Sequence, residues 1–134
     1  MARLNISMDE VLTLIEKNAD YDKKRIRSLG AINDKEVEIT VGIGFLPSIK
    51  VILVFNKFKE GKIYFTLNSN DNIINMFMGF LKKTDGDNFI YIHNKVVIVK
   101  ANKFLLKNFS GIQIIDLNIV DKEVYVKLYI NKNI

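Results

Sequence analysis

Apolar residues recur with a helical period near the start of the chain. Ser7 is followed three residues later by Glu10, which is the spacing of a capping box. Ile6 and Val11 occupy the two positions of a hydrophobic staple around it. The residues that share the apolar side are Met8, Val11, Leu12, Ile15 and Ala19. This pattern predicts an N-terminal amphipathic helix that ends near Asn18.

A period of two replaces the helical period from residue 37 onwards. Apolar residues alternate with polar residues or glycine over residues 37–45, again over 49–58, and a third time over 63–67. Pro47 separates the first two runs, and a short turn at Gly61 separates the last two. Because the first connection is too short for a helical crossover, these segments are predicted to form an antiparallel meander.

The second half of the chain shows the same mixture of patterns. Strands are predicted over residues 89–93 and 96–100, and a last hairpin over 112–120 and 124–130. Residues 101–109 between the two hairpins are predicted to form a short helix. The chain has 134 residues, without a linker or internal repeat, so we expect a single α+β domain built on an antiparallel sheet.

The most unusual segment lies between these two groups of strands. Residues 71–83 are predicted to form a helix whose apolar side chains cover about 200° of its circumference. They are Ile73, Ile74, Met76, Phe77, Met78, Phe80 and Leu81. One flat sheet face would leave part of this arc in water. That exposure is unfavourable, because burying each such side chain stabilises the folded state by about 1.5–3 kcal/mol. A curved sheet, a second protomer or lipid must therefore cover the remainder.

The ordinary interpretation of this segment is an internal core helix, and the sharper hypothesis is a site for an apolar ligand. Met76 and Met78 offer adaptable surface for acyl chains, although methionine fills protein cores equally well. Lys82 and Lys83 beside the arc suit lipid phosphates, or simply the negative end of the helix dipole. We expect the seven apolar residues and these two lysines to form the ligand site.

Composition restricts the chemistry of the chain. Twenty Lys and Arg against fifteen Asp and Glu give a net charge of +5, and the chain contains no Cys and a single His. Disulfides, thiolate metal sites and thiol nucleophiles are therefore excluded. His93 stands near a hairpin turn without a partner at a catalytic spacing, and Asp85-Gly-Asp-Asn88 lacks the remaining ligands of a calcium loop. We expect no enzyme activity, metal ion or cofactor.

Two further features carry weaker functional alternatives. Residues 20–27 mix charges of both signs, which indicates a solvated connection or edge strand, or alternatively a phosphate-binding patch. Tyr125 and Tyr129, with Lys127 between them, share one face of the last predicted strand and could stack bases and bind phosphate. Gly42 and Gly44 indicate a bend or bulge of the sheet.

The order of these elements carries a resemblance to a known family. The better-matching portions are Val37-Glu-Ile-Thr-Val-Gly-Ile43 continuing through 49–67, and Val97-Ile-Val-Lys-Ala-Asn-Lys-Phe-Leu-Leu106 followed by 112–129. Over about residues 5–130 the chain resembles small bacterial members of the LmeA-like phospholipid-binding family, within the tubular lipid-binding class. The resemblance implies a curved antiparallel sheet packed around an apolar helix, with lipid or membrane contact and no covalent chemistry.

The leading expectation is non-enzymatic binding of a lipid-like apolar ligand or an anionic membrane surface through the helix over 71–83. One alternative is a homo-oligomer in which the same apolar arc packs against its copy. A single-stranded nucleic-acid binder that uses Tyr125, Lys127 and Tyr129 is less favoured, because Arg residues are few. Without cysteine or a recognisable export signal, we expect the chain in the cytoplasm or at the membrane periphery.

Overall fold

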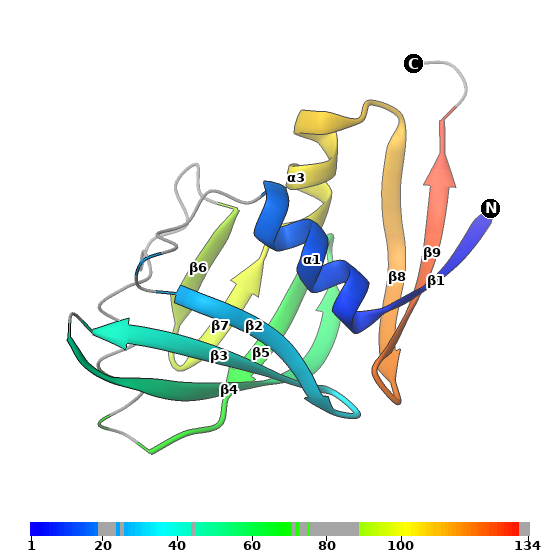
Figure 1. Cartoon of the computed structure of the whole chain (residues 1–134). Helices are drawn as coiled ribbons and strands as arrows, with labels where there is room; N and C mark the ends of the chain where they lie inside the picture. The colour runs from blue at the N-terminus through cyan, green and yellow to red at the C-terminus, as the bar shows by residue number, and fades with distance from the viewer. Residues whose placement is uncertain are drawn as a thin grey trace.

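The computed structural model shows an α+β domain with two antiparallel sheets (Figure 1). It describes residues 1–18, 24, 26–43, 45–70, 72, 75 and 89–131. Two short helices, α1 (Met8–Asn18) and α3 (Ala101–Asn108), accompany the sheets in this part of the chain. The predicted class, with mostly antiparallel strands, is therefore confirmed.

The predicted capping box starts α1. The Ser7 backbone N–H donates to Glu10 Oε1 over 3.3 Å, and the Glu10 N–H donates to Ser7 Oγ over 3.1 Å. These two bonds satisfy donors that have no partner inside the helix. Met8 and Leu12 on the apolar side of α1 are buried in the core. The helix ends at Asn18, as the sequence predicts.

The larger sheet has six strands in the order β2-β3-β4-β5-β7-β6. Their bounds are β2 (Ile26–Asn33), β3 (Glu36–Ile43), β4 (Leu46–Lys59), β5 (Lys62–Leu67), β6 (Ile90–His93) and β7 (Val96–Val99). The predicted meander is β3 to β5, and β2 is the edge strand that residues 20–27 lead into. The long strand β4 pairs with β3 through its first part and with β5 through its second.

One face of this sheet is apolar on neighbouring strands. Directly opposed residues share a face, and the pairs run from β3 to β6 without a break. They are Val37 with Leu53, Ile39 with Val51, Leu53 with Leu67, Phe55 with Phe65, Phe65 with Val97, and Val97 with Ile92. The rings of Phe55 and Phe65 meet edge to face with centroids 6.1 Å apart. This face forms the main part of the core.

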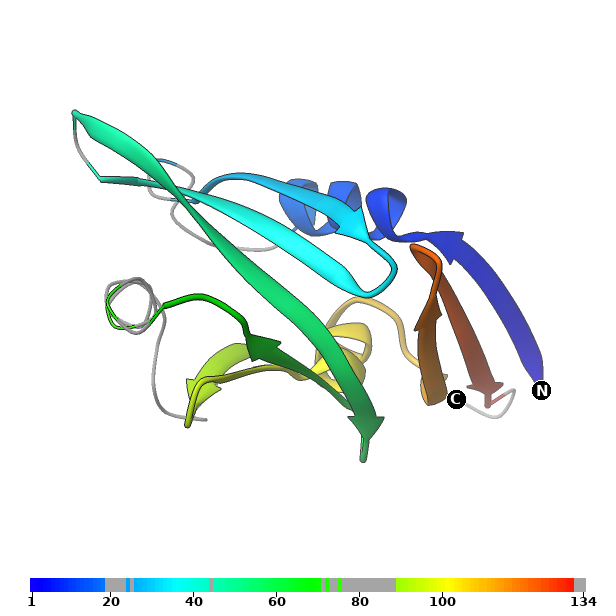
Figure 2. The ribbon, with the colours of Figure 1, turned by 90° about the horizontal axis from the view of Figure 1, so that it is seen from below.

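The smaller sheet joins the two ends of the described chain. Its order is β1-β9-β8, with β1 (Ala2–Ser7), β8 (Ile112–Val120) and β9 (Glu123–Ile130). The final hairpin β8–β9 was predicted, whereas β1 was not. In both views of the molecule this sheet lies at the opposite end from the β3–β4 turn (Figures 1 and 2).

The helix α1 covers the open edge of β2. Along this edge, the backbone N–H groups of Leu29 and Ala31 donate to Glu16 Oε1 and Asp9 Oδ1, each over 3.3 Å. An edge strand otherwise presents free donors that can pair with another chain. The predicted amphipathic helix therefore buries its apolar side and also satisfies a sheet edge with its acidic residues.

Candidate functional site

The predicted ligand site over residues 71–83 lies almost wholly outside the described residues. Those outside are Ile73, Ile74, Met76, Phe77, Met78, Phe80, Leu81, Lys82 and Lys83. Asn72 and Asn75 are described, and both are helical with exposed side chains. The predicted apolar arc leaves a narrow polar strip that includes Asn72 and Asn75, which would project about 60° apart viewed down the helix axis.

The strands on either side of this segment contribute apolar side chains to one face of the larger sheet. Ile63 and Phe65 of β5 and Ile90 of β6 are half-buried, whereas Ile92 and Val97 are buried. Among the described elements, α1 packs against β2, β8 against β4, and α3 against β5. The apolar face continues onto β7 and β6, where Ile92 and Val97 belong to the same hydrophobic core as residues of α1 and β8.

The tip of the β3–β4 hairpin carries an exposed aromatic ring. Phe45 is 99% exposed, and its neighbours Pro47 and Ser48 are also exposed. The Val41–Ile49 and Ile43–Leu46 pairs of the ladder lie immediately behind it. Between the Val41–Ile49 and Ile43–Leu46 pairs, β4 advances three residues against two on β3, so the predicted bulge lies on β4, opposite Gly42. The other glycine of that prediction, Gly44, lies outside the described residues.

Cationic side chains occur on the strands behind this tip. The Arg27 guanidinium lies so close to Gly42 that a Cβ built there would be 2.1 Å from Nε, and Nη1 donates to Ser48 Oγ over 3.0 Å. Lys50 Nζ lies 3.7 Å from Glu38 Oε1. Lys24, just before β2, is also exposed. Gly42 therefore makes room for an arginine that crosses the hairpin.

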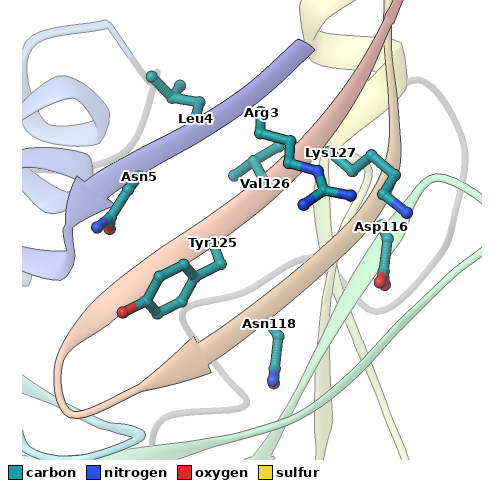
Figure 3. Close-up of a pocket in the computed structure, with 8 residues that line it drawn as sticks. All are labelled: Arg3, Leu4, Asn5, Asp116, Asn118, Tyr125, Val126 and Lys127. Atoms are coloured by element: carbon teal, nitrogen blue, oxygen red, sulfur yellow. The ribbon is translucent and has the colours of Figure 1, made fainter. Parts of the chain in front are cut away.

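The smaller sheet presents a mixed aromatic and cationic face. Tyr125 and Tyr129 on the central strand β9 are each 48% exposed, and Lys127 lies between them. The unpredicted strand β1 adds Arg3 opposite Lys127 and Asn5 opposite Tyr125. Apart from Tyr129, these residues border a shallow cavity of about 310 Å³ (Figure 3), which is lined by Arg3, Leu4, Asn5, Asp116, Asn118, Tyr125, Val126 and Lys127.

The charges on this face partly compensate one another. Asp116 of β8 is opposite Lys127 on the side away from Arg3, so the row contains two cations and one carboxylate. Asp116 Oδ1 accepts the Leu117 N–H over 2.9 Å, and Asn118 Oδ1 accepts the Ile119 N–H over 2.9 Å. The sequence pattern predicts the β9 residues of this face but not Arg3. The alternation of Leu4 and Ile6 with polar residues is the signal that could have predicted the strand carrying Arg3.

The described titratable residues do not form a catalytic or metal-binding cluster. Among them, no three His, Asp or Glu side chains are grouped so that they could hold a metal ion. His93 is exposed, with Nε2 3.2 Å from Asn94 Nδ2. Lys100 is 7% exposed, with Nζ 5.3 Å from the centroid of the Tyr91 ring. Burial, followed by the charges of Lys103 and Lys62, lowers the pKa of Lys100.

Comparison with known proteins adds no assignment to this geometry. No family model matches the chain, and no curated protein or solved structure matches it either. In the part of the chain that the structure describes, no helix combines the length and apolar character needed to cross a bilayer.

Proposed function

We propose that the chain is a non-enzymatic domain that binds a lipid-like apolar ligand between segment 71–83 and the apolar face of the larger sheet. In this proposal the sheet curves around a helix over 71–83. The supporting observation is the continuous row of apolar pairs from β3 to β6, which includes β5 and β6, the two strands that flank the segment in the sequence. Ile92 and Val97 in this row are buried in the core, and Ile63, Phe65 and Ile90 beside them are half-buried, which leaves apolar surface for a ligand to cover.

The two described residues of the segment are consistent with this arrangement. Asn72 and Asn75 are helical and exposed, so the polar strip faces solvent at that point. If the helix continues at 100° per residue, Ile74 and Phe77 project from the opposite side. The apolar arc would then face the sheet, and it is wider than the strip that one sheet face contacts. An acyl chain fits the remaining apolar surface.

The charged end of the segment suits the polar part of such a ligand. In the proposal, Lys82 and Lys83 lie beside the headgroup of a phospholipid or fatty acid, where each offers a point charge to a phosphate or carboxylate. In the proposal, Lys82 and Lys83 could also bind the headgroups of an anionic membrane surface. No covalent step is required of any residue, because binding needs only apolar burial and charge complementarity.

Displacement of a fluorescent fatty acid tests this function. We expect the protein to bind the probe, and expect Phe77→Asp and Phe80→Asp to weaken binding at least about tenfold, because each places a charge against the acyl chain. Asn75→Asp on the exposed polar strip is the matched control and should bind normally. Circular dichroism identifies variants that remain folded. Equal probe affinity in folded Phe77→Asp, Phe80→Asp and Asn75→Asp would contradict the proposed site.

A second candidate function is binding of single-stranded nucleic acid on the smaller sheet. The observation that favours it is the pairing of β1 with β9, which brings Arg3 beside Lys127 between two exposed tyrosines. Tyr125 and Tyr129 lie four residues apart on one strand, roughly 13 Å, so each ring can stack a different base. The Arg3 and Lys127 charges lie between them, where a phosphate would pass.

A further inference from the structure

We propose that the tip of the β3–β4 hairpin docks onto an anionic lipid bilayer, with Phe45 inserted among the lipids and nearby cations at the headgroups. The proposed docking uses no residue of segment 71–83 and does not require a ligand there. It would place the domain at the membrane from which a lipid-like ligand is taken.

Phe45 has no role in the fold that explains its presence. It is the most exposed large apolar residue among those described, at 99%, and it sits at a turn rather than on a packed face. A fully exposed phenylalanine loses the transfer free energy that burial would provide, whereas insertion between lipids recovers it. For one aromatic ring this corresponds to at least about tenfold in affinity.

The hairpin holds this ring at an accessible point. β3 and β4 remain paired up to Ile43 and Leu46, beyond the register shift that follows Val41, so the tip stands on an antiparallel ladder. The end of this hairpin extends past the neighbouring elements, at the left in Figure 1 and at the upper left in Figure 2. A flat surface can therefore reach the tip without contacting the smaller sheet, which lies at the other end of the molecule.

The charges near the tip complement an anionic surface. Arg27 lies across β3 between Gly42 and Ser48. Exposed Lys24 comes two residues before Ile26, which pairs with Val41, and exposed Lys50 pairs with Thr40 on β3. Glu38, paired with Lys50, is the acidic residue of this group. A cation close to an anionic bilayer raises affinity about fivefold, and salt screens the effect. One inserted ring with a few adjacent cations is typical of reversible docking rather than stable anchoring.

Tryptophan fluorescence tests insertion directly, because the chain contains no Trp. We expect the emission of Phe45→Trp to shift to shorter wavelength with vesicles of phosphatidylcholine and phosphatidylglycerol, and to be quenched by brominated acyl chains. Phe109→Trp, at a 56% exposed position at the C-terminal end of α3, is the control and should show neither effect. An unchanged Phe45→Trp spectrum, or equal shifts at both positions, would overturn the proposal.

Vesicle flotation provides the second arm. We expect Phe45→Asp to weaken binding to the anionic vesicles at least about tenfold, and Lys24→Gln to weaken it about fivefold at low salt. Phe45→Asp should keep the affinity for a fluorescent fatty acid in the absence of vesicles, which separates this surface from the proposed ligand site. Flotation that is unchanged by Phe45→Asp, or equally strong on pure phosphatidylcholine vesicles, would contradict docking through this tip.

Discussion

The side-chain amide of Asn102 pairs with the backbone of Ile114 as a neighbouring strand would. Its Nδ2 donates to the Ile114 carbonyl over 3.0 Å, and its Oδ1 accepts the Ile114 N–H over 2.7 Å. The Asn102 backbone N–H also donates to the Gly61 carbonyl over 3.1 Å. One residue of α3 therefore connects the β4–β5 turn of the larger sheet to β8 of the smaller sheet.

Removal of this amide should destabilise the domain. We expect Asn102→Ala to lower the free energy of unfolding by about 1–3 kcal/mol, because the part-buried Ile114 donor and acceptor lose their partner. Urea unfolding measures the change. Asn5→Ala, at an exposed position on β1, is the control and should change stability little. Equal losses in the two variants would show that the Asn102 bonds do not stabilise the fold.

The capping box should contribute a somewhat smaller amount to the free energy of unfolding than the Asn102 bonds. We expect Ser7→Ala to lower the free energy of unfolding by about 0.5–2 kcal/mol, because the Glu10 N–H loses its acceptor at the start of α1. Ser110→Ala in the exposed turn before β8 changes the same side chain without removing a cap. Thermal unfolding of both variants checks this prediction, and it is wrong if Ser7→Ala is no less stable than Ser110→Ala.

Lys100 should make stability rise with pH in the alkaline range. Its pKa is lowered in the folded chain, so between that pKa and the usual value of 10.5 the unfolded chain binds more protons. Below this window the folded protein bears the full cost of keeping Lys100 charged in a part-desolvated position near Lys103 and Lys62, and above it that cost disappears. Lys100→Met removes this dependence.

The measurement is the Tm of Lys100→Met minus that of the wild type. We expect this difference to decrease as the pH is raised from 7 toward 10.5, because only the wild type gains stability from deprotonation of Lys100. Lys59→Met, at an exposed position of β4, is the control and should not show the trend. A Tm difference for Lys100→Met that is constant with pH would show that deprotonation of Lys100 does not raise the stability of the folded chain.

The nucleic-acid candidate makes its own quantitative prediction. Binding of oligo-dT should weaken with salt, and Arg3→Gln should reduce the slope of log K against log salt by about 0.7 if Arg3 neutralises one phosphate. Tyr125→Ala and Tyr129→Ala should each cost about 1–3 kcal/mol of binding free energy. Filter binding over a salt series measures both effects, and a wild-type chain that retains no oligo-dT eliminates this candidate.

Elements that depend on local signals could be predicted from the sequence. The Ser7–Glu10 box fixes the start of α1 within four residues, and alternation in β3, β4 and β5 determines both strand type and buried face. The β8–β9 hairpin could equally be predicted from the sequence, because its strands are consecutive and its turn is short. The pattern also placed Tyr125, Lys127 and Tyr129 on one face.

Non-local pairing limited the rest of the prediction. β1 is short and its partner β9 lies near the other end of the chain, so no local signal links Arg3 to Lys127. The bonds of Asn102 to Ile114 and of the Lys122 N–H to the Asp34 carbonyl likewise join segments distant in sequence. The division of the strands into two sheets depends on such contacts. For the same reason, the Arg27 crossing at Gly42 could not be foreseen from the glycine alone.

Native mass spectrometry of protein purified without detergent, followed by organic extraction and lipid analysis, tests the proposed function most directly. We expect a species heavier than the 15.5 kDa chain by one apolar molecule, which extraction releases. Folded Phe77→Asp should lack this molecule, and Asn75→Asp should retain it. A ligand-free monomer, or a ligand-free dimer in which the apolar arc meets its copy, would contradict lipid binding, provided that neither species takes up added fatty acid.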